Sequence, residues 1–159
     1  MSIQIVKGNL FDHINKIDYD AILLHACNAQ GVWGSGVAIE FKNRFPQSFA
    51  EYKNFCEEQA QEYHWGARGM CLITSENIAC LVTSFKYGQD KDDPATILKS
   101  TSMALEDMFN QLLQKQLVKV YSPKINAGLF QVPWKNTEEV IQRCIYQSAL
   151  NVEWTVFEL

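Results

Sequence analysis

The sequence lacks the signatures of several large protein classes. Its five cysteines are an odd number at irregular spacings, and none stands in a CxxC pair or a Cys/His ligand pattern, so we expect neither a disulfide framework nor a metal site. No apolar run reaches the roughly 18 residues that a membrane helix needs, and the first residues contain no basic leader followed by an apolar core. We therefore predict a monomeric cytoplasmic protein without a cofactor, small enough at 18.2 kDa to diffuse into a nucleus.

An excess of basic residues is also missing. The formal net charge is -4 at pH 7, and the pI is near 5.3. Because a duplex-binding surface needs clustered Lys and Arg to neutralise phosphates, we do not expect direct binding to duplex nucleic acid. The 159 residues, of which 47% are hydrophobic and 20% charged, are instead typical of a compact domain with a substantial core. We predict a single domain over residues 1–159.

Hydrophobic patterns of strand and helix type alternate along the chain. Strands are predicted at residues 3–7, 20–26, 118–125 and 152–159, with a hairpin or two successive strands at residues 69–75 and 77–85. Helices are predicted at residues 36–45, 47–61, 94–112 and 136–148. This alternation predicts a three-layer α/β/α sandwich around a mixed, mainly parallel central sheet.

An acidic segment, residues 90–94, precedes the third predicted helix. Asp92 and Asp93 ahead of Pro94 fit an N-cap followed by a proline in the first helical turn. A metal site is the alternative, but no further carboxylates converge on the segment in the sequence. We therefore favour the helix cap.

Two loops follow predicted parallel strands, at the edge where ligands bind in such sheets. The first loop, residues 26–36, contains Gly31, Gly34 and Gly36 directly before a helix. Glycines allow positive φ and close backbone approach, so backbone N–H groups and the helix N-terminus can converge on an anion. Their order, G-x-x-G-x-G, matches neither the Rossmann fingerprint nor a P-loop, and a purely structural turn is an equally common use of such glycines.

The second loop, residues 123–133, adds another run of small residues at positions 126–128. No carboxylate occurs between Asp107 and Glu138, a stretch that contains Lys115, Lys119, Lys124 and Lys135. Any one of these lysines is most simply a solvated side chain. An acidic protein that keeps both loops free of carboxylates nevertheless favours an anionic ligand with two or more phosphates.

His25 and Asn28 lie at the exit of the second strand, beside the glycine-containing loop. Each has a structural interpretation, His25 as a satisfied core histidine and Asn28 as the former of an Asx turn. His25 is, however, the only group in this stretch that transfers protons near neutral pH, which favours an acid–base role beside a bound anion. Cys27 suggests the nucleophile of a cysteine-based phosphatase, but no arginine follows it closely to clamp a phosphate, so we interpret it as a packing residue.

Together these motifs resemble the macrodomain family, whose members bind ADP-ribose. The resemblance extends over essentially the whole chain, through IVKGNLF near the start, LLHACNAQGVWGSGVAIEF, SPKINAGLFQVPW and the closing EWTVFEL. Within the family, the patterns HxCNxxGxWGxGxA and PxINxGxFxVPW are most similar to those of the small fungal ADP-ribose 1''-phosphate phosphatases. The resemblance implies a macrodomain fold and an ADP-ribose derivative as the ligand, with ADP-ribosylated proteins as a further class of partner.

The same resemblance implies a binding site, position by position. His25 would be the catalytic residue and Asn28 would orient the distal ribose, with Ala26 and Cys27 beside it. Asn9, where many macrodomains have aspartate, would accept a hydrogen bond from the adenine amino group. The remaining residues would border the adenine (Gly8 and Leu10) or wrap the diphosphate (Trp33, Gly34, Ser35, Gly36, Val37, Ala38, Ile125, Asn126, Ala127, Gly128, Leu129, Phe130 and Gln131).

The sequence departs from the family pattern at several positions. Gln131 replaces a glycine that is usual after the aromatic residue of the second loop. Ala38 and Ile39 stand where several ADP-ribosyl hydrolases have an aspartate just after the glycines. Compared with the related terminal ADP-ribose glycohydrolase, Ser84 replaces the lysine nucleophile and Phe130 the catalytic aspartate. Both known glycohydrolase dyads are therefore missing.

Three functions follow as hypotheses. The first is release of inorganic phosphate from ADP-ribose 1''-phosphate, a by-product of tRNA splicing, with His25 as general acid or water-activating base. One acid–base group supplies only about 10² to 10⁴ of the acceleration, so we expect a slow and selective enzyme. The second is hydrolysis of ADP-ribosyl esters, on acidic side chains or in O-acetyl-ADP-ribose. The third is a non-catalytic ADP-ribose reader.

Overall fold

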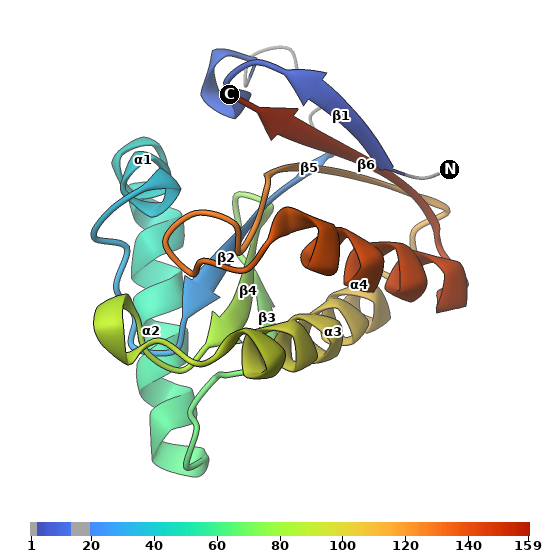
Figure 1. Ribbon diagram of the computed structural model, residues 1–159. Helices are drawn as coiled ribbons and strands as arrows, with labels where there is room; N and C mark the ends of the chain where they lie inside the picture. Colours follow the sequence, from blue (N-terminus) through green and yellow to red (C-terminus); the bar gives the residue numbers. More distant parts are fainter. Residues whose placement is uncertain (1–2, 14–19) are drawn as a thin grey trace.

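The computed structural model describes residues 3–13 and 20–159 of the chain. A six-stranded sheet runs through its centre in the order β1-β6-β5-β2-β4-β3 (Figure 1). Neighbouring strands are parallel except β3 and β4, which are antiparallel. The strands are β1 (Ile3–Lys7), β2 (Ile22–Asn28), β3 (Cys71–Ile73), β4 (Ile78–Ser84), β5 (Leu117–Pro123) and β6 (Asn151–Glu158). The mixed, mainly parallel sheet predicted from the sequence is thus confirmed.

Helices cover both faces of this sheet (Figure 1). One face packs against α1 (Val37–Arg44) and α2 (Pro46–Glu62), and the other against α3 (Pro94–Gln111) and α4 (Trp134–Gln147). Two short 3-10 turns, η1 (Leu10–Asp12) and η3 (Gly88–Asp90), follow β1 and β4. Of the helices described, none is long and apolar enough to cross a membrane. The predicted three-layer sandwich is confirmed.

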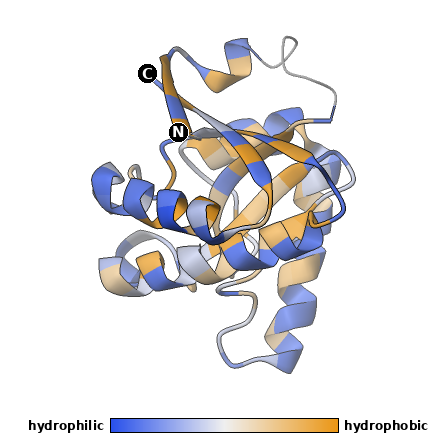
Figure 2. Ribbon diagram, turned by 90° about the vertical axis from the view of Figure 1, so that its right-hand side faces the viewer, coloured by the Kyte–Doolittle hydropathy of each residue, from blue (hydrophilic) through white to orange (hydrophobic). Residues whose placement is uncertain are grey.

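The central strand β2 is buried from both sides, as its continuous apolar pattern predicts. Leu24 packs in the cluster beneath α3 and α4, whereas Leu23 and Cys27 pack with Phe41 of α1 and Tyr52 of α2. In Figure 2 the hydrophobic residues gather on the strands and on the helix sides that face them. Because successive side chains of a strand point to opposite faces, the odd-numbered residues of β2 face α1 and α2.

The helix starts depend on local signals, and one of them was predicted wrongly. Asp93 caps α3 by accepting a hydrogen bond from the Thr96 N–H at 2.8 Å, so the predicted cap is confirmed. The fourth helix was expected to begin at Asn136. It begins earlier, at Trp134, because Pro133 already supplies the N-cap position with φ near -54°.

Candidate ligand-binding cavity

A cavity of about 700 Å³ opens where β2, β4 and β5 end. Ala26 of β2 contributes to its lining, together with residues 35–38 after β2 and residues 123–131 after β5, except Ala127. A third segment, the residues Tyr87, Gly88, Gln89 and Lys91 after β4, completes the lining. Both loops that the sequence marked as candidates therefore meet at one site. The third segment was not predicted.

The loop after β2 brings its backbone close to the second loop. Gly36, the N-cap of α1, has φ 62° and ψ -147°, a conformation that is essentially restricted to glycine. A Cβ atom at this position would lie 3.2 Å from Leu129 Cδ1. Gly36 is therefore required both for the turn into α1 and for the close approach of the two loops.

The second loop is held in place by the buried side chain of Asn126. Its Oδ1 accepts a hydrogen bond from the Thr83 hydroxyl at 2.9 Å, and its Nδ2 donates to the Thr101 hydroxyl at 3.0 Å. The Asn126 carbonyl also accepts from the Val132 N–H at 2.8 Å, which closes the loop. Gln131, which departs from the family's glycine, has φ 59° and so occupies a conformation that glycine adopts at lower cost.

The third segment is anchored at both ends by Ser84. The Ser84 hydroxyl donates to the Lys86 carbonyl at 2.7 Å and accepts from the Asp92 N–H at 3.0 Å. The Asp92 carboxylate accepts from the Phe85 N–H at 2.9 Å and pairs with Arg68 at 3.4 Å. Ser84, which the sequence comparison set against the lysine nucleophile of a related hydrolase, is fully buried and closes this loop.

Lys91 and Lys124 are the charged side chains of the described lining, which contains no carboxylate. Lys124 forms a short ion pair with Glu158, near the end of β6. The Lys124 hydrogen bond and then its charge lower the pKa of the Glu158 carboxyl. The lining therefore combines backbone groups with positive charge, an arrangement suited to an anion.

His25 is not brought to this cavity. Its ring is completely buried and stacks on Phe41, with centroids 4.1 Å apart and 6° between the planes. The edge of the Trp33 indole lies against it, with 4.6 Å between centroids. Since His25 is an odd-numbered residue of β2, its side chain enters the layer beneath α1 and α2, while its neighbour Ala26 lines the cavity. The expectation that the imidazole faces a bound ribose is not met in this geometry.

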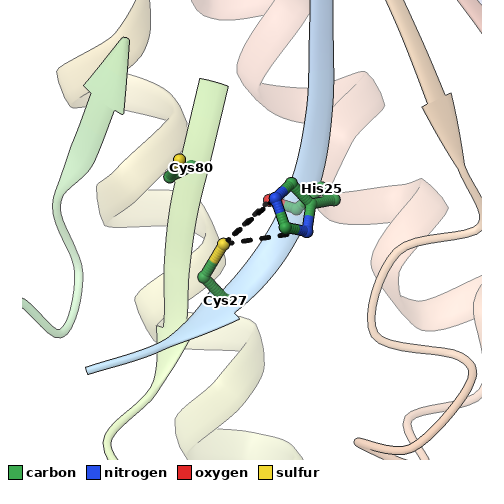
Figure 3. Close-up of side chains that lie close together, drawn as sticks. All are labelled: His25, Cys27 and Cys80. Atoms are coloured by element: carbon green, nitrogen blue, oxygen red, sulfur yellow. Dashed lines mark hydrogen bonds between the residues drawn. The ribbon is translucent and has the colours of Figure 1, made fainter. Parts of the chain in front are cut away.

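Cys27 belongs to the same buried layer, as predicted for a packing residue. Its Sγ lies 3.8 Å from Nδ1 and 3.6 Å from Nε2 of His25, with Cys80 of β4 beside it (Figure 3). Burial raises the pKa of the Cys27 thiol, but hydrogen bonding with Cys80 and the charge of His25 outweigh it and lower the pKa to about 5. The thiol is only 2% exposed, so it faces His25 and not a ligand.

The potential ligand atoms of His25, Cys27 and Cys80 all lie within 4.8 Å of one another. A metal ion bound by the imidazole has to lie along the lone pair of one ring nitrogen. The Cys27 sulfur is almost equally distant from both nitrogens, so its contacts do not select one of them. All three residues are buried in the core.

Asn28 uses its side chain to build the glycine-containing loop. Its Oδ1 accepts hydrogen bonds from the Gln30 N–H at 3.0 Å and the Val32 N–H at 3.3 Å, and its Nδ2 donates to the Val32 carbonyl at 2.8 Å. The Tyr52 hydroxyl donates to the Asn28 carbonyl. The Asx-turn interpretation is the one that the structure supports, and Asn28 does not line the cavity.

The other residues that were expected at the ligand but do not line the cavity are Gly8, Asn9, Leu10, Trp33, Gly34 and Ala127. Asn9 accepts a hydrogen bond from the Phe11 N–H at 2.9 Å and caps η1, and Leu10 is buried. The Trp33 side chain is only 1% exposed and stacks on Tyr52, because it lies beneath the loop and not on its outer surface. Trp33 therefore supports the loop that was expected to wrap the diphosphate.

Comparison with known proteins identifies the family. A family model described as Macro domain matches residues 24–141. The chain belongs to the macrodomain family. It is 35% identical to an ADP-ribose 1''-phosphate phosphatase of Meyerozyma guilliermondii, with 92% of this chain and 95% of the relative covered. A protein with the same name from Debaryomyces hansenii is 34% identical, with coverages of 89% and 93%.

Solved macrodomain structures share the fold of this macrodomain. The macrodomain of Mycobacterium tuberculosis DarG has a TM-score of 0.74 at 20% identity, covering 99% of this chain and 97% of that chain. At that identity the likeness establishes the fold alone. The family and the fold predicted from the sequence are both confirmed.

The segment after β4 is the part of the macrodomain cavity that sequence reasoning missed. Its one marked feature is the acidic run at residues 90–94, in which Asp93 caps α3 and Asp92 anchors the segment. The segment lies at the cavity because β4 pairs with β2, a strand far away in the sequence. A local sequence pattern does not indicate which distant strands pair.

Proposed function

We propose that this macrodomain is an ADP-ribose 1''-phosphate phosphatase, which releases inorganic phosphate from that ester. The fungal relatives of this name align over 92% and 89% of the chain. The observation that carries the proposal is the cavity lining. It combines the backbone of two tightly anchored loops with Lys91 and Lys124 and has no carboxylate among the described residues. A ligand with several phosphates is complementary to such a lining.

In this proposal the diphosphate lies over the loop that leads into α1. Residues 35–38 present their backbone there, and the N-terminus of α1 adds a partial positive charge. Gly36 holds the turn, and the anchored loop at residues 123–131 encloses the ligand from the other side. Binding therefore depends on backbone positions more than on particular side chains.

The reaction transfers the phosphoryl group from the anomeric oxygen of the ribose to water. The bond between phosphorus and the anomeric oxygen breaks, a bond from phosphorus to the water oxygen forms, and a water proton passes to the leaving oxygen. That oxygen is a better leaving group than an ordinary alkoxide, because the anomeric hydroxyl is more acidic. The described lining contains neither imidazole nor carboxylate, so positioning and charge stabilisation supply the acceleration, and we expect slow turnover.

His25 acts in this proposal as a packing residue beneath the loop. Its ring contacts Trp33 and Phe41, which flank residues 34–38 in the sequence. The imidazole would reach a ligand only by leaving that stack. A role for His25 as a general acid or base therefore requires a rearrangement of the core.

A non-catalytic reader of ADP-ribose is the second candidate. The observation that favours it is the same absence of imidazole and carboxylate groups from the described lining. A reader needs only the backbone cradle and the positive charge, and both are present. Hydrolysis of ADP-ribosyl esters would use the same cavity and is distinguished by its products.

A substrate panel tests the proposal. ADP-ribose 1''-phosphate, O-acetyl-ADP-ribose and a peptide ADP-ribosylated on glutamate are each incubated with the purified chain, and the release of phosphate and of ADP-ribose is measured in parallel. We expect release of phosphate, and only from the first compound. ADP-ribose released from either of the other two identifies an ester hydrolase. Tight ADP-ribose binding without turnover of any compound identifies a non-catalytic reader.

A further inference from the structure

Among the residues that the structure describes, Lys91 has no acidic partner, unlike the other cation of the cavity. Lys124 is paired with Glu158, so much of its charge is already compensated. The ion pairs among the described residues do not include Lys91, whose Nζ lies 3.4 Å from the Gly88 carbonyl as its nearest hydrogen-bonding contact. Its charge is therefore available to a ligand.

The acidic neighbours of Lys91 are directed elsewhere. Asp92 is bound to Arg68 and to the Phe85 N–H, and Asp93 accepts from the Thr96 N–H at the start of α3. Asp90 is exposed and does not line the cavity. The anchoring through Ser84 and Asp92 holds this short segment, with Lys91 on it, against the cavity.

The order of the strands places Lys91 at one end of the cavity. Lys124 follows β5, which is next to β6, and Glu158 of β6 accepts the Gly8 N–H through its carbonyl. Lys91 follows β4, on the far side of β2. Along this edge the loops come in the order β1, β5, β2, β4, and neighbouring strands are about 4.8 Å apart. In the proposed function, a ligand that lies along this edge with its base on the β5 side and its diphosphate over the β2 loop extends its other ribose toward Lys91.

We propose that Lys91 forms a subsite for a phosphate monoester at the end of the ligand remote from the base. This inference rests on the proposed function and names the group that sets its selectivity. A phosphate monoester brings up to two further negative charges compared with ADP-ribose, and an ammonium group on a flexible stem binds such a group as a point charge. Tyr87, half exposed at the same end of the cavity, forms the adjacent wall.

The test compares two ligands that differ at the 1'' position, where one has a hydroxyl and the other a charged phosphonate. Dissociation constants are measured by calorimetry for ADP-ribose and for a hydrolysis-resistant 1''-phosphonate analogue, with the wild type, Lys91→Gln and Lys99→Gln. Lys99 is an exposed lysine of α3 outside the cavity, so its substitution is a control with the same charge change. Phosphate release from the ester by the wild type is measured alongside.

We expect the wild type and Lys99→Gln to bind the phosphonate more tightly than ADP-ribose. In Lys91→Gln this preference should fall about tenfold, because the affinity for the phosphonate falls more than the affinity for ADP-ribose. The inference is overturned if the wild type shows no preference for the phosphonate, or if Lys91→Gln keeps that preference. It is also overturned if Lys91→Gln loses affinity for both ligands equally. Loss of the preference in a protein that releases no phosphate supports the subsite and overturns only the proposed activity.

Discussion

The imidazole of His25 lies parallel to the phenyl ring of Phe41, with 4.1 Å between the centroids and 6° between the planes. Trp33 closes the stack from the side. The histidine that the sequence singled out as an acid–base group is therefore part of an aromatic core beneath the glycine-containing loop. A packing role and an acid–base role of His25 predict different effects of substitutions on stability and on catalysis.

Replacing His25 by alanine should destabilise the protein. The substitution empties a fully buried site and removes the stack on Phe41, so we expect the free energy of unfolding to fall by about 2 to 4 kcal/mol. Denaturant-induced unfolding followed by tryptophan fluorescence measures this. A variant as stable as the wild type would show that the ring contributes nothing to packing.

His25→Phe separates packing from chemistry. It keeps an aromatic ring in the stack but has no titratable nitrogen, so we expect phosphate release to stay within about tenfold of the wild type. Steady-state kinetics on ADP-ribose 1''-phosphate give kcat and KM. A drop in kcat of about 10² to 10⁴, with KM and thermal stability unchanged, would instead assign His25 the acid–base role.

Adding a side chain at Gly36 should weaken ligand binding. Gly36→Ala places a Cβ 3.2 Å from Leu129 Cδ1 and forces alanine into a conformation that is essentially restricted to glycine. Because relief of this strain moves the cradle, we expect the dissociation constant for ADP-ribose to rise about tenfold or more, as measured by calorimetry.

Gly34→Ala is the matched control for this variant. Gly34 lies on the same exposed loop without positive φ, and its nearest neighbour would be Val32 Cγ1 at 3.4 Å. Its affinity for ADP-ribose should change little. Equal losses in the two variants would contradict the role given to the Gly36 conformation.

The titration of Glu158 should report its pairing with Lys124. The hydrogen bond from Lys124 and then the charge of Lys124 lower the pKa of Glu158, and Lys7 adds a smaller effect from 3.9 Å. Because the pKa is lower in the folded state, the pair stabilises the fold above the ordinary glutamate pKa and loses this effect as the pH falls through the lowered value.

Lys124→Gln should therefore raise the pKa of Glu158 toward its ordinary value, and NMR titration of the side-chain carboxyl resonance measures the change. Lys7→Gln is the control and should raise it less. If the Lys7 variant gave the larger shift, the assignment of Lys124 as the main partner would be wrong.

Local patterns account for most of the fold. The apolar run of β2, the cap at Asp93 and the alternation of strand and helix lengths are all properties of neighbouring residues, so they can be interpreted without tertiary contacts. The start of α4 was misplaced because Asn136 resembles a cap, whereas the constrained backbone of Pro133 begins the helix earlier. The strand order required contacts between distant segments.

The candidate site divides in the same way. The loops at residues 35–38 and 123–131 were recognisable because glycines and a stretch without carboxylates are visible in the sequence. Lys91 could not be recognised in the same way, because only the pairing of β2 with β4 brings it to the cavity. The direction of the His25 side chain depends on which face of β2 borders the cavity, and that is a property of the assembled layers.

The sequence by itself determined the layered fold and the two loops at the sheet edge, because periodicity and turn residues act over short distances. It also indicated the family, through the resemblance of its motifs. Only the tertiary structure decided that the His25 ring lies in the core while Lys91 lines the cavity. Alternation along a strand shows that neighbouring side chains face opposite ways, but the packing of helices and loops on each face decides which of them meets a ligand.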